Sequence, residues 1–404
     1  MKSMGVIVEY NPFHNGHLHH LEISKMKTNA DAAIAVMSGN FLQRGEPALV
    51  SKWSRAKMAL RSGVDIVIEL PYAFATQKAE TFAFGSICLL DAMHCQSYCF
   101  GSESGDIGAF THTIEKLERS EDRMNSLIKE NIKEGMSYPS SVSKAIASLG
   151  LTGEGHVDLT TPNNILGYHY MKAAREIGTA MKAFTIQRKN ADYHDEDFSS
   201  ATIASATSIR KALFSEGFQQ DVIRQYVPES TIEELISYHK EFTIFHQWER
   251  YWPLLQYRLI SASLDELANI YEIEEGIEHR LKEAAQLASS FQEFMTKVKT
   301  KRYTWTRIQR MVLHVLTNTT KEQMISHCHK PSYIRLLGMN EKGRKYLGMV
   351  KKELSLPMIS KLSSAKQEDI HLDIRASNVY AQGLPEPYKA KLMKMEYSQP
   401  PIQL

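Results

Sequence analysis

Short apolar runs recur through the first half of the chain, and each has the length and β-rich composition of a buried strand. The segments between them repeat apolar residues every three or four positions, which is the spacing of one helix face. The runs expected to be strands are residues 5–10, 32–39, 65–71, 96–103 and 181–187. The segments expected to be helices are residues 16–28, 51–63 and 79–93. This alternation predicts an α/β fold, a doubly wound parallel sheet that helices cover on both faces.

The pattern changes further along the chain. Residues 106–177 are mostly helical in spacing and predict a helical insertion before the last strand of an α/β domain that spans residues 1–215. Residues 229–330 predict an appended, mostly α-helical domain, with long helical runs at 230–242, 263–273 and 277–301. Residues 331–404 are expected to pack back as a small α/β segment.

The composition is ordinary for a soluble globular protein, since 43% of the 404 residues are hydrophobic and 23% are charged. The net charge is only +2, so a nucleic-acid partner must be held by a local basic patch. No apolar run approaches the roughly 20 residues that cross a bilayer, so no membrane partner is expected. The four cysteines are too few for a disulfide framework and predict a cytoplasmic protein. Cys95 and Cys99 lie near His94 without a second pair of ligands, so no metal site is expected.

The string EYNPFHNGHLHHLE, residues 9–22, places two histidines where the first strand should give way to a helix. Pro12 disfavours helix at the residue before it and predicts a turn. The free backbone N–H groups of the helix that follows form a ready anion site. His14 and His17 lie on either side of that helix start, so both imidazoles can reach one phosphate and stabilise charge during transfer at an α-phosphate. The alternative is an ordinary Asn-Gly turn with surface histidines, which the position of the string disfavours.

A second string, ASATSIRKAL at residues 204–213, carries hydroxyl groups just before a helix and an arginine in its first turns. Thr207, Ser208 and Arg210 are therefore candidate phosphate-binding residues, although a plain helix cap is the alternative. Together with the histidine string, this segment resembles the second signature of the nucleotidylyltransferase superfamily, usually written I-S-S-T-x-I-R. Ala206 stands in place of the second serine, so that hydroxyl is not essential here.

Six strings in order, VEYNPFHNGH, SGNFLQRGEPA, DIVIELP, FGSE, PNNILG and ASATSIRKAL, resemble the bacterial tRNA(Met) cytidine acetate ligase family. The resemblance is strong over the first 215 residues. It implies a Rossmann-like nucleotidylyltransferase domain with a helical region for tRNA. It also implies a carbon–nitrogen ligase that makes acetyl-adenylate from acetate and ATP and then acetylates the N4 amine of the wobble cytidine in elongator tRNA(Met). AMP and pyrophosphate would be released.

The resemblance also implies an ATP site that includes the histidine string. Its residues are Ile7, Val8, Glu9, Tyr10, Asn11, Pro12, Phe13, His14, Asn15, Gly16, His17, Leu18, His19, His20, Gly101, Asn163 and Arg188. Gly101 would let adenosine lie against bare backbone, and Arg188 ends the last strand, where it can face the phosphates. Asn163 can pair with a polar base or ribose edge, with Asn164 as the alternative. From the residues alone, Asn163 is equally a helix cap and Arg188 a solvated strand end.

Acetate needs a small pocket with hydrogen-bond donors beside the α-phosphate. The loop after the second strand supplies Ser38, Asn40, Gln43 and Arg44, and Arg44 can hold a carboxylate or a tRNA phosphate. An ordinary polar loop is the alternative. Adenylation needs no general base because acetate is ionised at neutral pH. Mg²⁺ is expected with ATP, held mainly by phosphate and water.

The candidate RNA segment is KVKTKRYTWTRIQR, residues 297–310, in which cations alternate with aromatic residues. Its candidate tRNA contacts are Lys299, Lys301, Arg302, Tyr303, Trp305 and Arg307. Cations can hold the RNA backbone while aromatic rings stack on splayed bases of a loop. The alternative is a basic helix face whose aromatic residues are buried in the helical core.

Two other functions remain open from the sequence. One is a small-molecule adenylyltransferase of the pantetheine-phosphate or nicotinamide-nucleotide type, which would leave the helical half of the chain unexplained. The other is a non-catalytic nucleotide-binding or RNA-binding protein. No obligate protein partner is evident in the sequence.

Overall fold

The computed structural model describes residues 1–136, 138–151, 153, 155–188, 204–215, 220–362, 365 and 370–404. At the centre of the fold lies a twisted sheet whose first five strands are all parallel. They are β1 (Ser3–Val8), β2 (Ala32–Ser38), β3 (Ile66–Leu70), β4 (Ser97–Ser102) and β5 (Lys182–Gln187), in the spatial order β5-β4-β1-β2-β3. All five predicted strands form, and the predicted doubly wound α/β fold is confirmed.

The C-terminal segment extends the same sheet. Strand β6 (Ile334–Met339) pairs antiparallel with β3, so the sheet is mixed rather than wholly parallel. The short strands β7 (Met358–Ile359) and β8 (Ile402–Gln403) both pair parallel with β6. The end of the chain therefore contributes strands to the fold that carries the N-terminal motifs.

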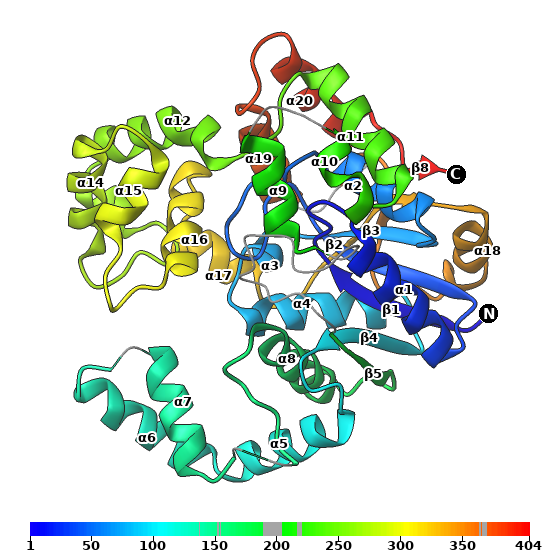
Figure 1. Ribbon diagram of the computed structural model, residues 1–404, viewed down its shortest axis with the longest axis horizontal. Helices are drawn as coiled ribbons and strands as arrows, with labels where there is room; N and C mark the ends of the chain where they lie inside the picture. The colour runs from blue at the N-terminus through cyan, green and yellow to red at the C-terminus, as the bar shows by residue number, and fades with distance from the viewer. Residues whose placement is uncertain are drawn as a thin grey trace.

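Helices cover both faces of the sheet (Figure 1). The predicted helices α1 (Asn15–Thr28), α2 (Lys52–Arg61) and α4 (Ala79–Ala92) form, as does α8 (Pro162–Glu176), which packs along α4. Right-handed crossovers place α1 and α2 on one face and α4 and α8 on the other. Between β4 and α8, the helices of the predicted insertion are α5 (Ile107–Arg119), α6 (Glu121–Lys133) and α7 (Tyr138–Ser148), which extend beyond the sheet in Figure 1.

The helical half of the chain lies beside the sheet, and its helices α12 to α16 form a lobe at the left of Figure 1. Its helices are α11 (Glu229–Phe242), α12 (Trp248–Ser261), α13 (Leu264–Ala268), α14 (Ile277–Leu287), α15 (Phe291–Val298), α16 (Trp305–Leu316) and α17 (Lys321–His327). Helix α11 packs on α2 of the sheet domain. The run at 277–301 divides into α14 and α15 because Ser290 caps α15, its hydroxyl accepting the Glu293 N–H at 3.1 Å.

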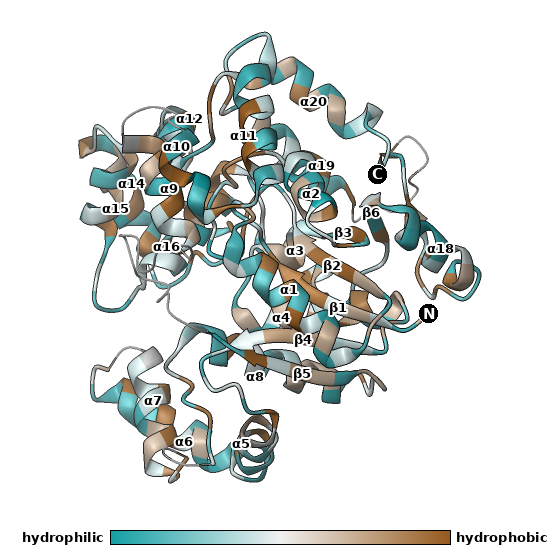
Figure 2. Ribbon diagram, turned by 45° about the vertical axis from the view of Figure 1, so that its right-hand side comes forward, coloured by the Kyte–Doolittle hydropathy of each residue, from teal (hydrophilic) through white to brown (hydrophobic). Residues whose placement is uncertain are grey.

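The remaining helices connect these parts. They are α3 (Tyr72–Ala75), α9 (Ala206–Ser215), α10 (Gln220–Ile223), the 3₁₀ turn η1 (Arg224–Tyr226), α18 (Glu341–Val350), α19 (Ile370–Ala381) and α20 (Tyr388–Ser398). In Figure 2 the central strands are largely hydrophobic, whereas the surrounding helices alternate hydrophilic and hydrophobic residues. Among the described residues, no helix combines the length and the apolar character that a membrane span requires.

Candidate active site

The candidate site lies where the winding direction of the sheet reverses. The chain leaves β1 toward β2 on one side and returns to β4 on the other, so the carboxyl ends of β1 and β4 diverge. Ile7, Val8 and Glu9 are partly exposed although β1 is a central strand whose earlier residues are buried. Gly101 is likewise the partly exposed residue of the otherwise buried β4. A ligand can therefore reach the backbone of both strands at this edge.

The two histidines of the first motif form the N-terminal cap of α1. The His14 Nδ1 atom accepts the Gly16 N–H at 3.1 Å, and the His17 Nδ1 atom accepts the His14 N–H at 3.3 Å. Their rings stack with centroids 3.7 Å apart. Because a neutral imidazole carries its proton on the nitrogen that is not accepting, both Nε2 atoms carry hydrogen. The local sequence thus creates two parallel N–H donors at a helix start.

Both imidazoles are neutral near pH 7. Burial lowers the pKa of His14 to about 3, and the charges of Arg188 and Arg210 act in the same direction. Burial likewise holds the pKa of His17 well below its usual value, with His14 and Arg188 contributing. The pair can therefore donate hydrogen bonds to a phosphoryl oxygen at physiological pH without first gaining a proton.

The turn before α1 is anchored from several directions. Tyr10 has a left-handed φ of 51°. Its ring packs against the rings of Phe13 and His17, with centroid distances of 4.6 Å and 5.0 Å. Asn11, which precedes Pro12 through a cis peptide bond, accepts the Leu49 N–H on its Oδ1 at 2.7 Å. Phe13 is fully buried. These contacts fix the position from which His14 begins the helix.

Arg188 lies beside the histidines and next to Gly101. A Cβ on Gly101 would lie 3.4 Å from the Arg188 Cγ atom and 3.7 Å from the His20 Cδ2 atom, so the three residues are neighbours. Burial lowers the pKa of His20 to about 4, and the Arg188 charge adds to the effect. The pKa of three imidazoles thus responds to one guanidinium, which indicates a positively charged region at the helix start.

The two neighbouring asparagines of α8 have different roles. Asn164 is buried, and its side chain accepts the Ser104 N–H at 3.1 Å and donates to the Asp158 carbonyl at 3.0 Å. Asn163 is partly exposed and donates from Nδ2 to the Glu103 carboxylate at 2.7 Å. Asn163 is therefore the more exposed of the two.

Glu103 is a residue that sequence reasoning did not assign, although it ends the quoted string FGSE. Its carboxylate also accepts the Asn164 N–H at 2.8 Å and the Thr161 hydroxyl at 3.0 Å, so it caps α8. Burial alone would raise its pKa, but the hydrogen bonds from Asn163, Thr161 and Asn164 hold the pKa below its usual value. Glu103 remains ionised and fixes the start of α8.

The second motif anchors the first. The Arg210 guanidinium donates to the Asn11 carbonyl at 2.9 Å and forms an ion pair with Glu46 at 3.1 Å. Ser208 is buried, and its hydroxyl donates to the Ser205 carbonyl at 2.9 Å. Thr207 is partly exposed at the start of α9. The structure therefore brings the two motifs together through Arg210, while the Ser208 hydroxyl is used within the helix.

The loop after β2 divides between the site and the protein interior. Asn40 is buried and caps α2, accepting the Lys52 N–H at 2.9 Å and donating to Ser377 at 3.2 Å. Ser38 is also buried. The Gln43 N–H donates to the Glu9 carboxylate at 2.8 Å, and the Arg44 carbonyl accepts from Gln309 at 3.0 Å. The Gln43 side chain donates to the Gln77 carbonyl at 2.6 Å. Gln43 and Arg44 are thus partly exposed, whereas Ser38 and Asn40 are buried.

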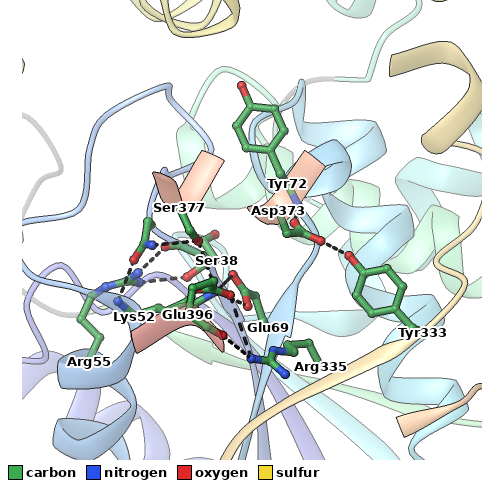
Figure 3. Close-up of polar contacts among 12 residues, drawn as sticks. Ser38, Lys52, Arg55, Glu69, Tyr72, Tyr333, Arg335, Asp373, Ser377 and Glu396 are labelled. Carbon is green, nitrogen blue, oxygen red and sulfur yellow. Dashed lines mark hydrogen bonds and ion pairs between the residues drawn. The ribbon is translucent and has the colours of Figure 1, made fainter. Parts of the chain in front are cut away.

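A buried charge network lies under this loop (Figure 3). The Lys52 ammonium is fully buried and contacts the carboxylates of Glu69 and Glu396, each at 2.8 Å. Arg335, also buried, lies 4.0 Å from Glu396. Asp373 accepts the Tyr72 N–H at 2.6 Å and a hydrogen bond from the Tyr333 hydroxyl. The network joins the ends of β2 and β3 to the C-terminal helices α19 and α20.

Arg55 links the backbone at the carboxyl ends of β1 and β2. Its buried guanidinium donates to the Glu9 carbonyl at 2.7 Å and to the Ser38 carbonyl at 3.0 Å, and it also contacts the Gly39 carbonyl. Its Nε atom donates to the Val50 carbonyl at 3.3 Å. Nothing in the helical spacing of 51–63 distinguishes this arginine from a surface cation, so sequence reasoning missed it.

Many cations of the predicted RNA segment are paired within the protein. Arg302 forms an ion pair with Glu275 at 2.6 Å, and Arg307 forms one with Glu274 at 3.0 Å. Tyr303 is buried, and its hydroxyl donates to Glu275 at 3.0 Å. Trp305 is partly buried against the core, whereas Lys299 and Lys301 are exposed. The contact of this segment with tRNA stays a prediction.

The whole chain matches one class of protein. A model of the HIGH nucleotidyl transferase family matches residues 1–395, which include the histidine motif, the helical lobe and strands β1 to β7 of the sheet. The chain is 50% identical over 407 residues to the tRNA(Met) cytidine acetate ligase of Bacillus licheniformis, covering 100% of this chain and 97% of that protein. It is 47% identical over 407 residues to the protein of the same name from Bacillus subtilis, with the same coverage.

Solved structures match equally well. The apo crystal structure of Thermotoga maritima TmcAL superposes with a TM-score of 0.92 at 35% identity, and each chain is covered completely. A second structure of that protein, bound with alpha-thio ATP, superposes with a TM-score of 0.90. The chain therefore belongs, among the HIGH nucleotidyl transferases, to the tRNA(Met) cytidine acetate ligase family. The resemblance recognised in six short strings is confirmed over the full length.

Proposed function

We propose that this protein ligates acetate to the N4 amine of the wobble cytidine in elongator tRNA(Met). Acetate would first attack the α-phosphate of ATP to give acetyl-adenylate and pyrophosphate, and the cytidine would then take the acetyl group and release AMP. The observation that carries the proposal is the pair of neutral imidazole donors at the α1 start, in a chain half identical over its whole length to such ligases. The identity extends through the helical half, which the small-molecule adenylyltransferase alternative leaves unexplained.

The geometry supports one placement of ATP. The triphosphate would lie over the start of α1, where the Nε2–H groups of His14 and His17 meet the α-phosphate and stabilise its developing charge. Arg188 would face the phosphates, since its charge already reaches these imidazoles. Adenosine would lie against the bare backbone of Gly101, with Asn163 at its polar edge. Thr207 and Arg210 would border the phosphates from α9.

Mg²⁺ would enter with ATP. The described residues include no group of three or more carboxylate, histidine or cysteine side chains placed to hold an ion. The triphosphate and water would therefore supply most of its ligands, as Mg²⁺ commonly prefers. Acetate would bind beside the α-phosphate near Gln43 and Arg44. We place the reaction in the cytoplasm, where ATP and tRNA are both present.

The exposed cations of the helical lobe are the proposed tRNA contacts. Lys299, Lys301 and Arg302 are exposed at the end of α15, where they could meet RNA phosphates. Tyr303 packs inward beneath the Arg307 guanidinium, 5.0 Å from its ring centroid, so this segment would act by charge more than by stacking.

A substitution that separates capping from catalysis tests the histidine assignment. Asparagine is a preferred N-cap residue, so His14→Asn should keep α1 capped while removing the Nε2–H donor. The rate of pyrophosphate release from ATP and acetate should fall on the order of 10²–10³-fold, with little change in Tm. His279→Ala, at an exposed position on α14, is the control. A near-normal rate in the His14→Asn variant would contradict the assignment.

An isotope-labelling experiment tests which phosphorus atom of ATP the acetate attacks. With ¹⁸O-labelled acetate, attack at the α-phosphate transfers one labelled oxygen into AMP, because the bond that breaks in the second step joins carbon to that oxygen. Digestion of the product tRNA should give N4-acetylcytidine. ADP in place of AMP, or AMP free of label, would show that a different reaction occurs.

A further inference from the structure

Glu9 is the first residue beyond β1, and one of its carboxylate oxygens is held while the other is open. Its Oε1 atom accepts the Gln43 N–H at 2.8 Å. Its Oε2 atom accepts no hydrogen bond from the part of the chain that the structure describes, and Glu9 is a partly exposed residue. Glu9 directly follows β1, so it lies at the carboxyl end of the strand that leads into the turn before α1.

Charged groups surround Glu9 without neutralising it directly. Glu46 and Arg44 face it from the loop after β2, and Arg210 faces it from α9. Arg55 lies beneath it on α2, and Tyr170 faces it from α8. Arg210 is paired with Glu46, and Arg55 donates to backbone carbonyls.

These charges leave Glu9 a stronger base than an ordinary carboxylate. Burial raises its pKa most, and Glu46 acts in the same direction, whereas the Gln43 N–H and the two arginines oppose this. No ion pair within 4.0 Å joins its carboxylate to a described cation. Glu9 therefore keeps a lone pair that can take a proton.

The other described groups at this edge are poorer proton acceptors. His20 has an unpartnered Nε2 atom, but burial lowers its pKa to about 4. Both Nδ1 atoms of the histidine pair already accept backbone N–H groups, and their Nε2 atoms carry hydrogen. The Glu103 carboxylate accepts hydrogen bonds from Asn163, Asn164 and Thr161. Glu46 is neutralised by Arg210. Among these carboxylates, all within the described part of the chain, Glu9 is the one with an open oxygen.

The two steps of the proposed reaction differ in their need for a base. Acetate is already ionised when it attacks ATP, so the first step releases no proton. In the second step the N4 amine attacks the acetyl carbon. A carbon–nitrogen bond forms, the bond from that carbon to the AMP oxygen breaks, and AMP leaves with the electron pair. One amine proton must then be lost, because a neutral amide is formed.

We propose that Glu9 is the general base of the acetyl-transfer step and takes this proton from the cytidine amine on its Oε2 atom. The inference rests on the proposed function and assigns a residue to its second half. The resulting carboxylic acid returns the proton to water after AMP and the acetylated tRNA depart. Positioned bases of this kind contribute on the order of 10²–10⁴-fold to a rate.

Glu9→Gln tests the proposal because it retains an oxygen that can accept the Gln43 N–H but cannot take a proton. The two half-reactions are followed separately in single turnovers, acetyl-adenylate formation by trapping with hydroxylamine as acetohydroxamate, and transfer by N4-acetylcytidine in tRNA. We expect transfer to fall on the order of 10²–10³-fold and adenylation to fall by far less. Glu283→Gln, at an exposed position on α14, is the matched control. Equal losses in both half-reactions, or undiminished transfer, would overturn the proposal.

The pH dependence of the wild-type protein supplies a second, independent test. The base must be ionised, so the transfer rate should fall as pH decreases through the raised pKa of Glu9, and this limb should be absent from the residual rate of Glu9→Gln. A low-pH limb that persists unchanged in the residual rate of Glu9→Gln would also overturn the proposal. If the wild type forms no acetohydroxamate at all, the proposed function itself has failed, which separates the two outcomes.

Discussion

Lys52→Met removes the ammonium that lies between two buried carboxylates. The Lys52 Nζ atom is 2.8 Å from Glu69 and 2.8 Å from Glu396, and the three side chains are 0%, 5% and 3% exposed. Methionine has nearly the same length and no charge, so it fills the space without replacing the ion pairs. Glu69 and Glu396 would then be left close together in a buried site, where Arg335 lies 4.0 Å from Glu396.

The expected destabilisation follows from this geometry. Breaking a buried ion pair by removing one partner costs about 3–5 kcal/mol, because the other charge remains without compensation. An unfolding entropy of about 2.1 cal/mol/K per residue gives ~0.85 kcal/mol/K for the 404-residue chain, so Tm should fall by roughly 4–6 °C. The same substitution at Lys345, whose ion pair with Glu341 is 66% and 67% exposed, should leave Tm nearly unchanged, because water screens an exposed pair.

The loss should also depend on pH. Burial raises the pKa of Glu69, and the Lys52 charge opposes this, so removing Lys52 raises the folded-state pKa further. A carboxyl group with a raised folded-state pKa binds its proton more strongly in the folded protein. The free energy of unfolding of the variant therefore decreases as pH rises through that pKa. The deficit relative to wild type should be smaller at pH 5 than at pH 8.

Thermal unfolding of the wild type, Lys52→Met and Lys345→Met, followed by circular dichroism at pH 5 and pH 8, measures both effects. An equal loss of Tm in the two variants at pH 8 would mean that burial does not distinguish the two ion pairs. A Tm deficit of Lys52→Met that grows as the pH is lowered would contradict the expected linkage.

Three further predictions concern the site and its supports. Asn163→Ala should raise KM for ATP by about tenfold, the effect of one lost hydrogen bond. Asn164→Ala should instead lower Tm, because the hydrogen bonds of its buried side chain to Ser104 and Asp158 would be lost; the opposite pattern would exchange their roles. Arg55→Lys should lower the free energy of unfolding in urea by about 2–4 kcal/mol, because an ammonium cannot satisfy the carbonyls that the planar fork now holds. Lys301→Glu should weaken tRNA binding and flatten its salt dependence while ATP binding persists, and equal loss of both would make the segment structural.

The sequence alone determined the features that depend on short separations along the chain. The five parallel strands and the three helices between them were predictable because hydrophobic spacing repeats within each element. The histidine cap was predictable for the same reason, since His14 bonds to Gly16 and His17 to His14, only two or three residues apart. The order of the motifs then indicated the family.

The tertiary structure alone decided which distant residues complete each contact. Asn163 meets Glu103 across 60 positions, Arg210 meets Asn11 across 199, and Lys52 meets Glu396 across 344. In the sequence, the cations of residues 297–310 resemble an unpaired basic patch. In the folded protein, Arg302, Arg307 and Arg310 each form an ion pair with a glutamate of residues 272–275. Periodicity describes the face that an element buries, but the partner of a charge depends on strand order and on helix packing across the whole chain.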